Sequence, residues 1–191
     1  MSAFIPPPTR TAWYLRLGLW FARRVSGREL LPARLLAWYP KAAVSSGVME
    51  GLIAHHEGRI DERMLKLVRM TVSFDAGCPF CMDMNSAGWE DLLTVEELRA
   101  VQGRTALEAV GSFTEAERLA IEYARLVTAT PLMFPADFAA RLRAELNERE
   151  IVILATTAAQ VNYWTRLIQA LGCPPEGTGG ELYLEVRGGE M

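Results

Sequence analysis

The sequence has few cysteines and histidines and no excess of basic residues. It holds three cysteines and two histidines in 191 residues, and its formal net charge is −3 at pH 7. Three cysteines cannot build the disulfide framework that stabilises small secreted proteins. An acidic chain also lacks the electrostatic footprint that binds phosphate backbones, so we expect no nucleic-acid partner. The basic residues nearest to forming such a stripe are sparse: Arg10, Arg16, Arg23, Arg24 and Arg28.

Long apolar runs are missing as well. The most apolar stretch near the N-terminus, 13–25, is interrupted by Arg16, and no small-residue cleavage site follows it. A membrane-spanning helix needs about 20 apolar residues, and a signal peptide needs a cleavage site. We therefore expect a cytoplasmic protein without a membrane partner.

Helical patterns dominate what is present. Leu65, Val68 and Val72, for example, recur at helical spacing. Three helix starts fit a capping box, in which a polar side chain and an acidic one satisfy backbone N–H groups of the first turn: Thr94 with Glu97, Thr114 with Glu117, and Asn147 with Glu150. We expect an all-α chain with helices near 11–25, 30–44, 46–56, 61–75, 79–90, 95–101, 115–129, 135–145 and 148–171.

The two ends of the chain differ from the middle. We expect an N-terminal helical extension over 1–28, a main domain over 29–176 and a C-terminal tail over 177–191. The segment 181–186, "ELYLEV", alternates like a strand, but one short strand cannot form a sheet alone. We interpret it as an extended tail.

The predicted helix at 11–25 is amphipathic. It places Trp13, Leu17, Trp20 and Phe21 on one side and its arginines largely on the other. We interpret this helix as packing on its own domain or on a neighbouring subunit. A helix lying on a membrane surface is the alternative, because aromatic and arginine residues also suit that environment.

The stretch "GCPFC", 77–81, combines features of a reactive thiol site. If a helix begins at Pro79, Cys78 is the N-cap and Cys81 lies in the first turn, where free N–H groups and the helix dipole favour a thiolate. The spacing also lets the two sulfurs approach closely enough to form a disulfide. A lowered thiol pKa makes cysteine nucleophilic near neutral pH, so a redox dithiol is favoured.

Two other interpretations of the pair remain open. Two cysteines in one turn can be buried core residues, although an exposed turn after Gly77 argues against that. A zinc site needs four ligands, and Cys173, His55 and His56 are the remaining candidates. Adjacent histidines on a helix point in different directions, so we expect no metal site.

The blocks around the pair resemble a known family. They are "RIDERMLKLVRMTVSFDAGCPFCMDMN" (59–85), "SFTEAERLAIEYARLVTATP" (112–131) and "LNEREIVILATTAAQVNYWTRLIQALGCPPEG" (146–177). Their order and spacing are similar to the carboxymuconolactone decarboxylase and alkylhydroperoxidase D-like family over about residues 30–176. The resemblance implies an all-helical bundle, a cysteine pair near a subunit interface, and a homo-oligomer: a dimer, trimer or hexamer.

The resemblance also implies roles for the thiols. Family members with C-x-x-C look like thiol peroxidases that need no cofactor, so Cys81 is the candidate that attacks the peroxide and Cys78 the candidate that resolves the sulfenic acid as a disulfide. The partners implied are a small-molecule peroxide or disulfide and a thiol reductant of unknown identity.

This chain departs from the family at its proton relay. The family's peroxidases carry a glutamate twelve residues before the first cysteine and a histidine four after the second, where this chain has Lys66 and Asn85. An asparagine amide does not titrate, and a lysine is normally protonated at neutral pH. Lys66 would instead be a fixed charge that stabilises a thiolate, and Asn85 a hydrogen-bond donor to sulfur or peroxide. Asp83 would oppose a thiolate if it points inward.

Each of these residues also has an interpretation without a catalytic role. Lys66 and Asp83 also fit solvated surface charges, and His55 and His56 are either a replacement base or ordinary surface histidines. Several further positions are interpreted as structural. These are Asn162 and Arg166 in a buried interhelical hydrogen bond or salt bridge, Phe80, Met82 and Trp164 in the core or lining a pocket, and Cys173 as an inert thiol. A contact to the active pocket is the alternative for Asn162 and Arg166.

Three functions follow from the sequence. The first is a cysteine-dependent oxidoreductase that reduces peroxides or disulfides through the dithiol. The second is a decarboxylase-like lyase acting on a lactone acid, which has no need of a redox pair. The third is a non-catalytic oligomer that senses redox state through its disulfide.

Overall fold

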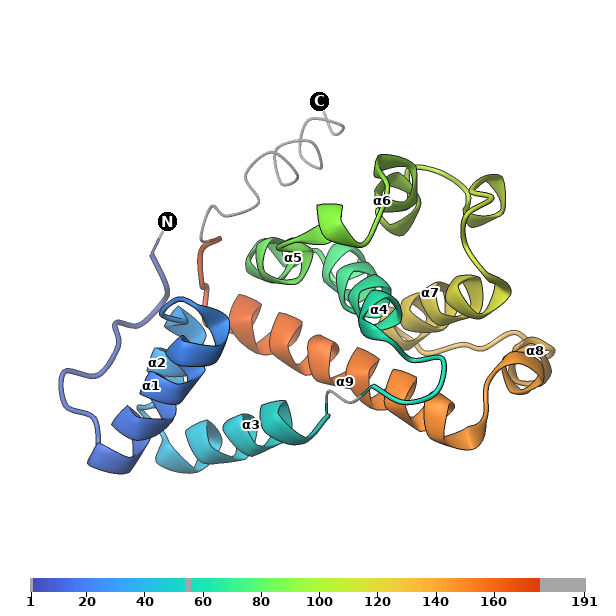
Figure 1. Cartoon of the computed structure of the whole chain (residues 1–191). Coiled ribbons are helices and arrows are strands. Elements are labelled where there is room, and N and C mark those ends of the chain that lie inside the picture. Colours follow the sequence, from blue (N-terminus) through green and yellow to red (C-terminus); the bar gives the residue numbers. More distant parts are fainter. Residues whose placement is uncertain (1, 54–55, 176–191) are drawn as a thin grey trace.

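The computed structural model describes residues 2–53 and 56–175. These residues form nine α-helices, two short 3-10 helices and no strand, which confirms the all-α class (Figure 1). The α-helices are α1 (Trp13–Ser26), α2 (Leu31–Leu36), α3 (Pro40–Ile53), α4 (Glu62–Asp75), α5 (Pro79–Ser86), α6 (Val95–Val101), α7 (Glu115–Thr128), α8 (Phe138–Glu145) and α9 (Glu148–Ala170). The 3-10 helices are η1 (Trp89–Asp91) and η2 (Leu107–Ala109).

Helices α4, α7 and α9 form the core of the molecule. The predicted apolar face of α4 is buried, and Leu65, Val68 and Val72 pack against Leu119 of α7 and Leu154 of α9. Each such side chain stabilises the fold by about 1.5–3 kcal/mol through burial. Among the helices of the described ranges, none is long and apolar enough to cross a membrane.

The predicted capping boxes are all present at the starts of α6, α7 and α9. Two of their glutamates have a second role, because Glu97 and Glu117 both accept hydrogen bonds from Arg63 of α4, at 2.7 and 2.6 Å. The capping residues therefore also fix α6 and α7 against the central helix.

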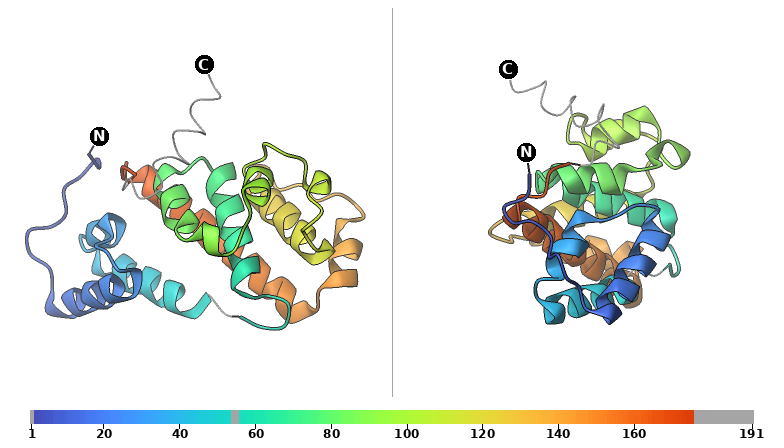
Figure 2. Two further views of the ribbon diagram at one scale, coloured as in Figure 1. Left: turned by 45° about the horizontal axis from the view of Figure 1, so that its top comes forward. Right: turned by 90° about the vertical axis from the view of Figure 1, so that its left-hand side faces the viewer.

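Helices α1, α2 and α3 form a separate group beside the core, here called the N-terminal arm (13–53). Figures 1 and 2 show the three helices side by side, with α3 lying against α9. The joint to α9 is polar: Ser46 and Tyr163 share a hydrogen bond of 2.7 Å, and Glu50 accepts hydrogen bonds from Gln160 and Trp164.

The helix boundaries in the arm were predicted wrongly. In place of helices at 30–44 and 46–56, α2 ends at Leu36 and α3 runs from Pro40 without a break at Ser45. Proline disfavours a helical conformation in the residue before it, so the chain breaks ahead of Pro40. Ser45 lies inside α3, where its hydroxyl donates to the Ala42 carbonyl at 3.2 Å.

The helix that begins at Pro79 was also predicted too long. α5 ends at Ser86 rather than near residue 90, and the chain then turns through Gly88, whose φ of +67° ends the helical path before η1. The predicted extended segment at 181–186 lies outside the described residues.

Candidate functional site

The cysteine pair lies at the start of α5, as the sequence predicts. Cys78 is the N-cap residue, with φ −98° and ψ 101°, and Pro79 takes the first helical position. The Cys81 backbone N–H donates to the Cys78 sulfur at 3.3 Å, so a sulfur performs the capping role usually taken by a hydroxyl or a carboxylate. The two sulfurs are joined as a disulfide across a Cα–Cα distance of 5.2 Å.

The pair is buried, which corrects the expectation of an exposed turn. Cys78 is 0% exposed and Cys81 is 3% exposed. Phe80 and Ile168 of α9 cover the sulfurs, and Cys173 packs at the edge of the same cluster. Gly77 itself is exposed, but the first residues of the helix that follows face α9. The glycine therefore marks an exposed turn without exposing the two sulfurs.

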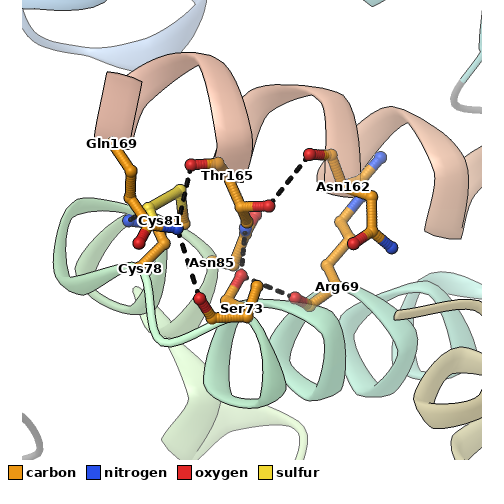
Figure 3. Close-up of a disulfide and its surroundings, with 9 residues drawn as sticks. Arg69, Ser73, Cys78, Cys81, Asn85, Asn162, Thr165 and Gln169 are labelled. Carbon is orange, nitrogen blue, oxygen red and sulfur yellow. Dashed lines mark hydrogen bonds between the residues drawn. A yellow bond between two sulfur atoms is a disulfide. The ribbon is translucent and has the colours of Figure 1, made fainter. Parts of the chain in front are cut away.

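Ser73 connects both ends of the site to α4. Its carbonyl accepts the Cys78 N–H at 3.2 Å, and its hydroxyl accepts the Asn85 side-chain N–H at 2.8 Å. The hydroxyl in turn donates to the Arg69 carbonyl at 2.8 Å (Figure 3). None of these groups titrates near neutral pH, so this chain of hydrogen bonds holds the geometry of the site but carries no ionisable base.

Little in the sequence pointed to Ser73. Serine in the middle of a helix usually bonds back to its own backbone, and Ser73 does so. Its additional bond to Asn85, twelve residues later in the chain, exists because α4 and α5 pack side by side.

A polar strip of α9 faces the disulfide from the other side. The Gln169 side chain donates to the carbonyls of Ala76 and Thr165, at 3.2 and 3.0 Å, and Thr165 donates to the Asn162 carbonyl at 2.9 Å (Figure 3). The bond to Ala76 holds the turn before Cys78 against α9. The pair is therefore held between two helices, α4 and α9.

Lys66 lies at the opposite end of α5 from the thiols. Its ammonium donates to the Ala87 carbonyl at 2.6 Å, just beyond the last residue of α5. The six residues from Cys81 to Ala87 span about 9 Å of helix. Burial lowers the pKa of Lys66, and the nearby Arg69 lowers it further. The structure thus places Lys66 as a half-buried cap of α5, rather than as a solvated charge or a neighbour of the sulfur.

The other candidate residues divide into buried and exposed ones. Asp83 is 3% exposed, so its interpretation as a solvated surface charge is wrong. His56 is exposed at the end of the arm, and His55 lies outside the described residues. Phe80 and Met82 are buried, as the sequence predicts for core positions.

The polar positions of α9 were predicted in part. The Asn162 side chain donates to the Thr128 hydroxyl of α7 at 3.0 Å, which confirms the expected interhelical hydrogen bond. Arg166 is exposed and forms no hydrogen bond or ion pair with residues 2–53 or 56–175, so the expected buried salt bridge is absent from that part of the chain. Trp164 donates to Glu50 at 2.8 Å and belongs to the joint with the arm.

Acidic, cysteine and histidine side chains do not gather elsewhere into an evident metal centre. In the described part of the chain, no group of three or more of them could hold a metal ion. The cysteine pair is the group whose geometry supports a specific reaction. It can exchange two electrons by passing between a dithiol and a disulfide.

Known proteins are similar to this chain in sequence and in fold. No family model matches the sequence. The uncharacterized protein YnjA of Escherichia coli is 26% identical over 180 residues, covering 91% of this chain and 94% of that protein.

Solved structures are similar over nearly the whole chain. The debrominase Bmp8 in complex with 2,3,4-tribromopyrrole superimposes with a TM-score of 0.81 at 18% identity, covering 97% of this chain and 98% of that one. A peroxidase-related protein from Ralstonia eutropha with an alkylhydroperoxidase AhpD core has a TM-score of 0.75 at 12% identity, covering 92% and 93%. The chain therefore has the carboxymuconolactone decarboxylase/alkylhydroperoxidase D fold.

Proposed function

We propose that this chain, which has the alkylhydroperoxidase D-like fold, is a cysteine-dependent oxidoreductase that reduces a peroxide through Cys81 and Cys78. The supporting observation is the disulfide at the start of α5, with the Cys81 N–H directed at the Cys78 sulfur. A dithiol and a disulfide differ by two electrons and two protons, which is what cleavage of one O–O bond requires.

The proposed reaction has two steps. The Cys81 thiolate attacks one peroxide oxygen, the O–O bond breaks, the alcohol leaves with a proton, and Cys81 becomes a sulfenic acid. The Cys78 thiolate then attacks the Cys81 sulfur, water leaves, and the disulfide forms. Backbone donation to the Cys78 sulfur favours its thiolate, which is the form that this second step needs. An external thiol reductant returns both cysteines to thiols.

No side chain of the Ser73–Asn85 chain supplies the proton in this proposal. The leaving oxygen takes its proton from water, and Asn85 orients the reactants by hydrogen bonding. Lys66 contributes by holding the C-terminal end of α5.

A second substrate class is favoured by the likeness to Bmp8, a debrominase with a TM-score of 0.81 to this chain. Reduction of a bromoarene by the same dithiol balances as well: the carbon–bromine bond breaks, hydrogen replaces bromine, bromide and a proton leave, and the two thiols become the disulfide. The two reactions use the same dithiol and differ in the molecule that accepts the two electrons.

A titration of thiols tests the proposal. Reduced protein should lose two thiols per chain after one equivalent of peroxide, and Cys81→Ser should abolish the loss. Cys78→Ser should stop at a sulfenic acid that dimedone traps, whereas Cys173→Ser, the control, should behave as the unaltered chain. Thiols that persist in peroxide would refute peroxide reduction. Bromide release from a bromopyrrole by such a protein would assign the second substrate class instead.

We also propose that the protein acts as a homo-oligomer. The exposed apolar residues of the arm support this proposal.

A further inference from the structure

Helix α1 exposes an apolar stripe along its whole length, here called the α1 stripe. Trp13 is 76% exposed, Val25 is 72% exposed, and Leu17, Trp20 and Phe21 are 60–62% exposed. Their spacing of i, i+4, i+7, i+8 and i+12 places all five on one face of the helix. At these exposures the rest of the described chain leaves the stripe largely uncovered.

The opposite face of α1 packs on the rest of the arm. Leu15 is buried, and Leu19, Ala22 and Ser26 are half-buried. Helix α3 lies against this side, and Figures 1 and 2 show α1 at the outer side of the arm, away from α7 and α8. The fold therefore anchors α1 on one side and presents the α1 stripe outward.

The charge of the chain is divided unevenly around this helix. Residues 1–28 contain five arginines and no acidic residue, which gives this segment a net charge of +5. Residues 29–191 hold the remaining 15 basic residues and all 23 acidic ones, a net charge of −8. A basic helix that carries an aromatic and aliphatic stripe is typical of helices that lie on the surface of an anionic membrane.

The arginines of α1 are placed where a helix lying on a bilayer can use them. At about 3.6 residues per turn, Arg16 and Arg23 follow one edge of the α1 stripe, and Arg24 lies near its C-terminal end. All three are exposed. Long arginine side chains reach from the edge of an apolar face to the lipid phosphates, and tryptophan is enriched at the depth of the headgroups.

A shallow hollow at the C-terminal end of α1 adds a polar feature to the stripe. It is lined by Trp20, Arg23, Arg24 and Gly27. Guanidinium groups bind phosphate and carboxylate oxygens through paired N–H donors. Arg23 also lies 3.6 Å from Glu29, but that pair is exposed and contributes little, so it does not hold the guanidinium away from another anion.

A second copy of this chain fits the α1 stripe less well than an anionic bilayer does. If two copies of α1 cross antiparallel near residue 20, Arg16 of each lies opposite Arg24 of the other, and a parallel pair sets each arginine beside its own copy. Like charges repel, whereas each basic residue near an anionic membrane strengthens binding about fivefold. A contact between subunits has other exposed apolar residues of the arm to use: Trp38, Tyr39, Val44 and Val48.

We propose that the α1 stripe is a docking surface for an anionic lipid bilayer, on which α1 lies flat with its five apolar side chains among the lipid chains and its arginines on the headgroups. The expectation of no membrane partner was based on the lack of a spanning segment and of a signal peptide. A helix that lies on the membrane surface needs neither. The inference goes beyond the redox function, because it assigns a surface and a partner that the thiol chemistry does not require.

Co-sedimentation of the full chain with sucrose-filled vesicles tests the proposal. Vesicles of equal parts phosphatidylcholine and phosphatidylserine should bind the chain about tenfold more tightly, or more, than vesicles of phosphatidylcholine alone. Added salt should reduce this difference, because it screens the charges. Tryptophan fluorescence should shift to shorter wavelength on binding, since Trp13 and Trp20 leave water.

Two double variants separate the apolar contribution from the charged one. Trp13→Ser with Trp20→Ser should weaken binding to the phosphatidylserine vesicles about tenfold or more, because two large apolar side chains no longer enter the lipid. Arg23→Gln with Arg24→Gln should weaken it about twentyfold, the effect of two basic residues. All four side chains are exposed, so both variants should keep the same helical circular dichroism.

Matched controls lie outside the arm. Met133→Ser replaces an apolar side chain that is 72% exposed between α7 and α8. Arg99→Gln with Arg143→Gln removes two exposed charges from α6 and α8, which changes the net charge of the chain as much as the arginine variant of α1 does. Neither control should change binding to the vesicles.

Three outcomes would overturn the proposal: no binding to either kind of vesicle, equal binding to both kinds, or binding that the double tryptophan variant leaves unchanged. Chains that pair without lipid through Trp13 and Trp20, and do not bind vesicles, would identify the α1 stripe as a contact between copies instead. None of these measurements depends on thiol oxidation, so failure of membrane docking and failure of the proposed redox function are distinguishable.

Discussion

Asn85 limits the acid–base chemistry that is available beside the disulfide. Its side chain lies one turn beyond Cys81 and donates to Ser73, whose hydroxyl donates onward to a backbone carbonyl. A histidine at this place would titrate near pH 6.5, but an asparagine does not. We therefore propose that Ser73 and Asn85 position α5 and do not move a proton.

Removing either partner of this hydrogen bond should slow thiol oxidation. We expect Ser73→Ala and Asn85→Ala each to lower the rate of oxidation by peroxide about tenfold, the equivalent of one lost hydrogen bond to a positioned group. The double variant should be no slower than either single one, because both remove the same interaction. Stopped-flow thiol titration gives the rates.

Thr71→Val is the control for this series. Thr71 lies on the same helix and donates to the Leu67 carbonyl at 2.8 Å, as Ser73 does to Arg69, but it has no bond to α5. It should change stability without changing the oxidation rate. Additive effects of Ser73→Ala and Asn85→Ala would contradict the shared role.

At the scale of the helix, the start of α6 combines capping with a buried ion pair. Burial alone would raise the pKa of the Glu97 carboxyl, but hydrogen bonds from Arg63, Ser112 and the Thr94 N–H lower it from 4.5 to about 2. A carboxyl whose pKa is lower in the folded chain stabilises the fold above its unfolded pKa. That stabilisation is lost as the pH falls from about 4.5 toward 2.

Glu97→Gln should therefore flatten the acid dependence of stability. The gap between the two pKa values corresponds to about 3 kcal/mol. We expect the free energy of unfolding of Glu97→Gln to be lower by up to this amount at pH 7 and to fall less between pH 5 and pH 2. Urea unfolding across this range measures both. Glu96→Gln, an exposed neighbour in the same turn, should leave the acid dependence unchanged.

At the scale of the whole molecule, one carboxylate of the N-terminal arm accepts two of the hydrogen bonds that join the arm to the core. One oxygen of Glu50 accepts hydrogen bonds from Gln160 at 2.7 Å and from Trp164 at 2.8 Å. Gln160 is 4% exposed, so its amide has no ready access to water when that partner is removed. The joint also lies on the same helix, α9, that covers the disulfide.

Glu50→Ala should loosen the arm without unfolding the core. We expect backbone amides of α3 to exchange with solvent about tenfold faster, which corresponds to about 1.4 kcal/mol, while those of α7 keep their protection. Hydrogen exchange followed by mass spectrometry resolves the two regions. Glu122→Ala, which removes a surface pair with Arg141 at 2.8 Å, should leave the arm unchanged. Equal acceleration in α3 and α7 would show that the joint supports the whole fold.

Local patterns predicted the elements well where one physical rule decides them. The three capping boxes and the start of α5 at Pro79 follow from short-range chemistry, since the groups involved lie within four residues of one another. The break between α2 and α3 was misplaced because the predicted helix at 30–44 ran through Pro40, which disfavours a helical conformation in the residue before it.

The sequence by itself determined the helical class, the position of the cysteine pair at a helix start, and the absence of a histidine where a relay would have one. Tertiary structure decided what surrounds the pair. The burial of Cys78 and Cys81 by α9, the bond from Asn85 to Ser73 and the placement of Lys66 on the Ala87 carbonyl all join segments from different helices. Contacts of this kind depend on how helices pack, and the spacing of residues along one helix does not encode which neighbour it will meet.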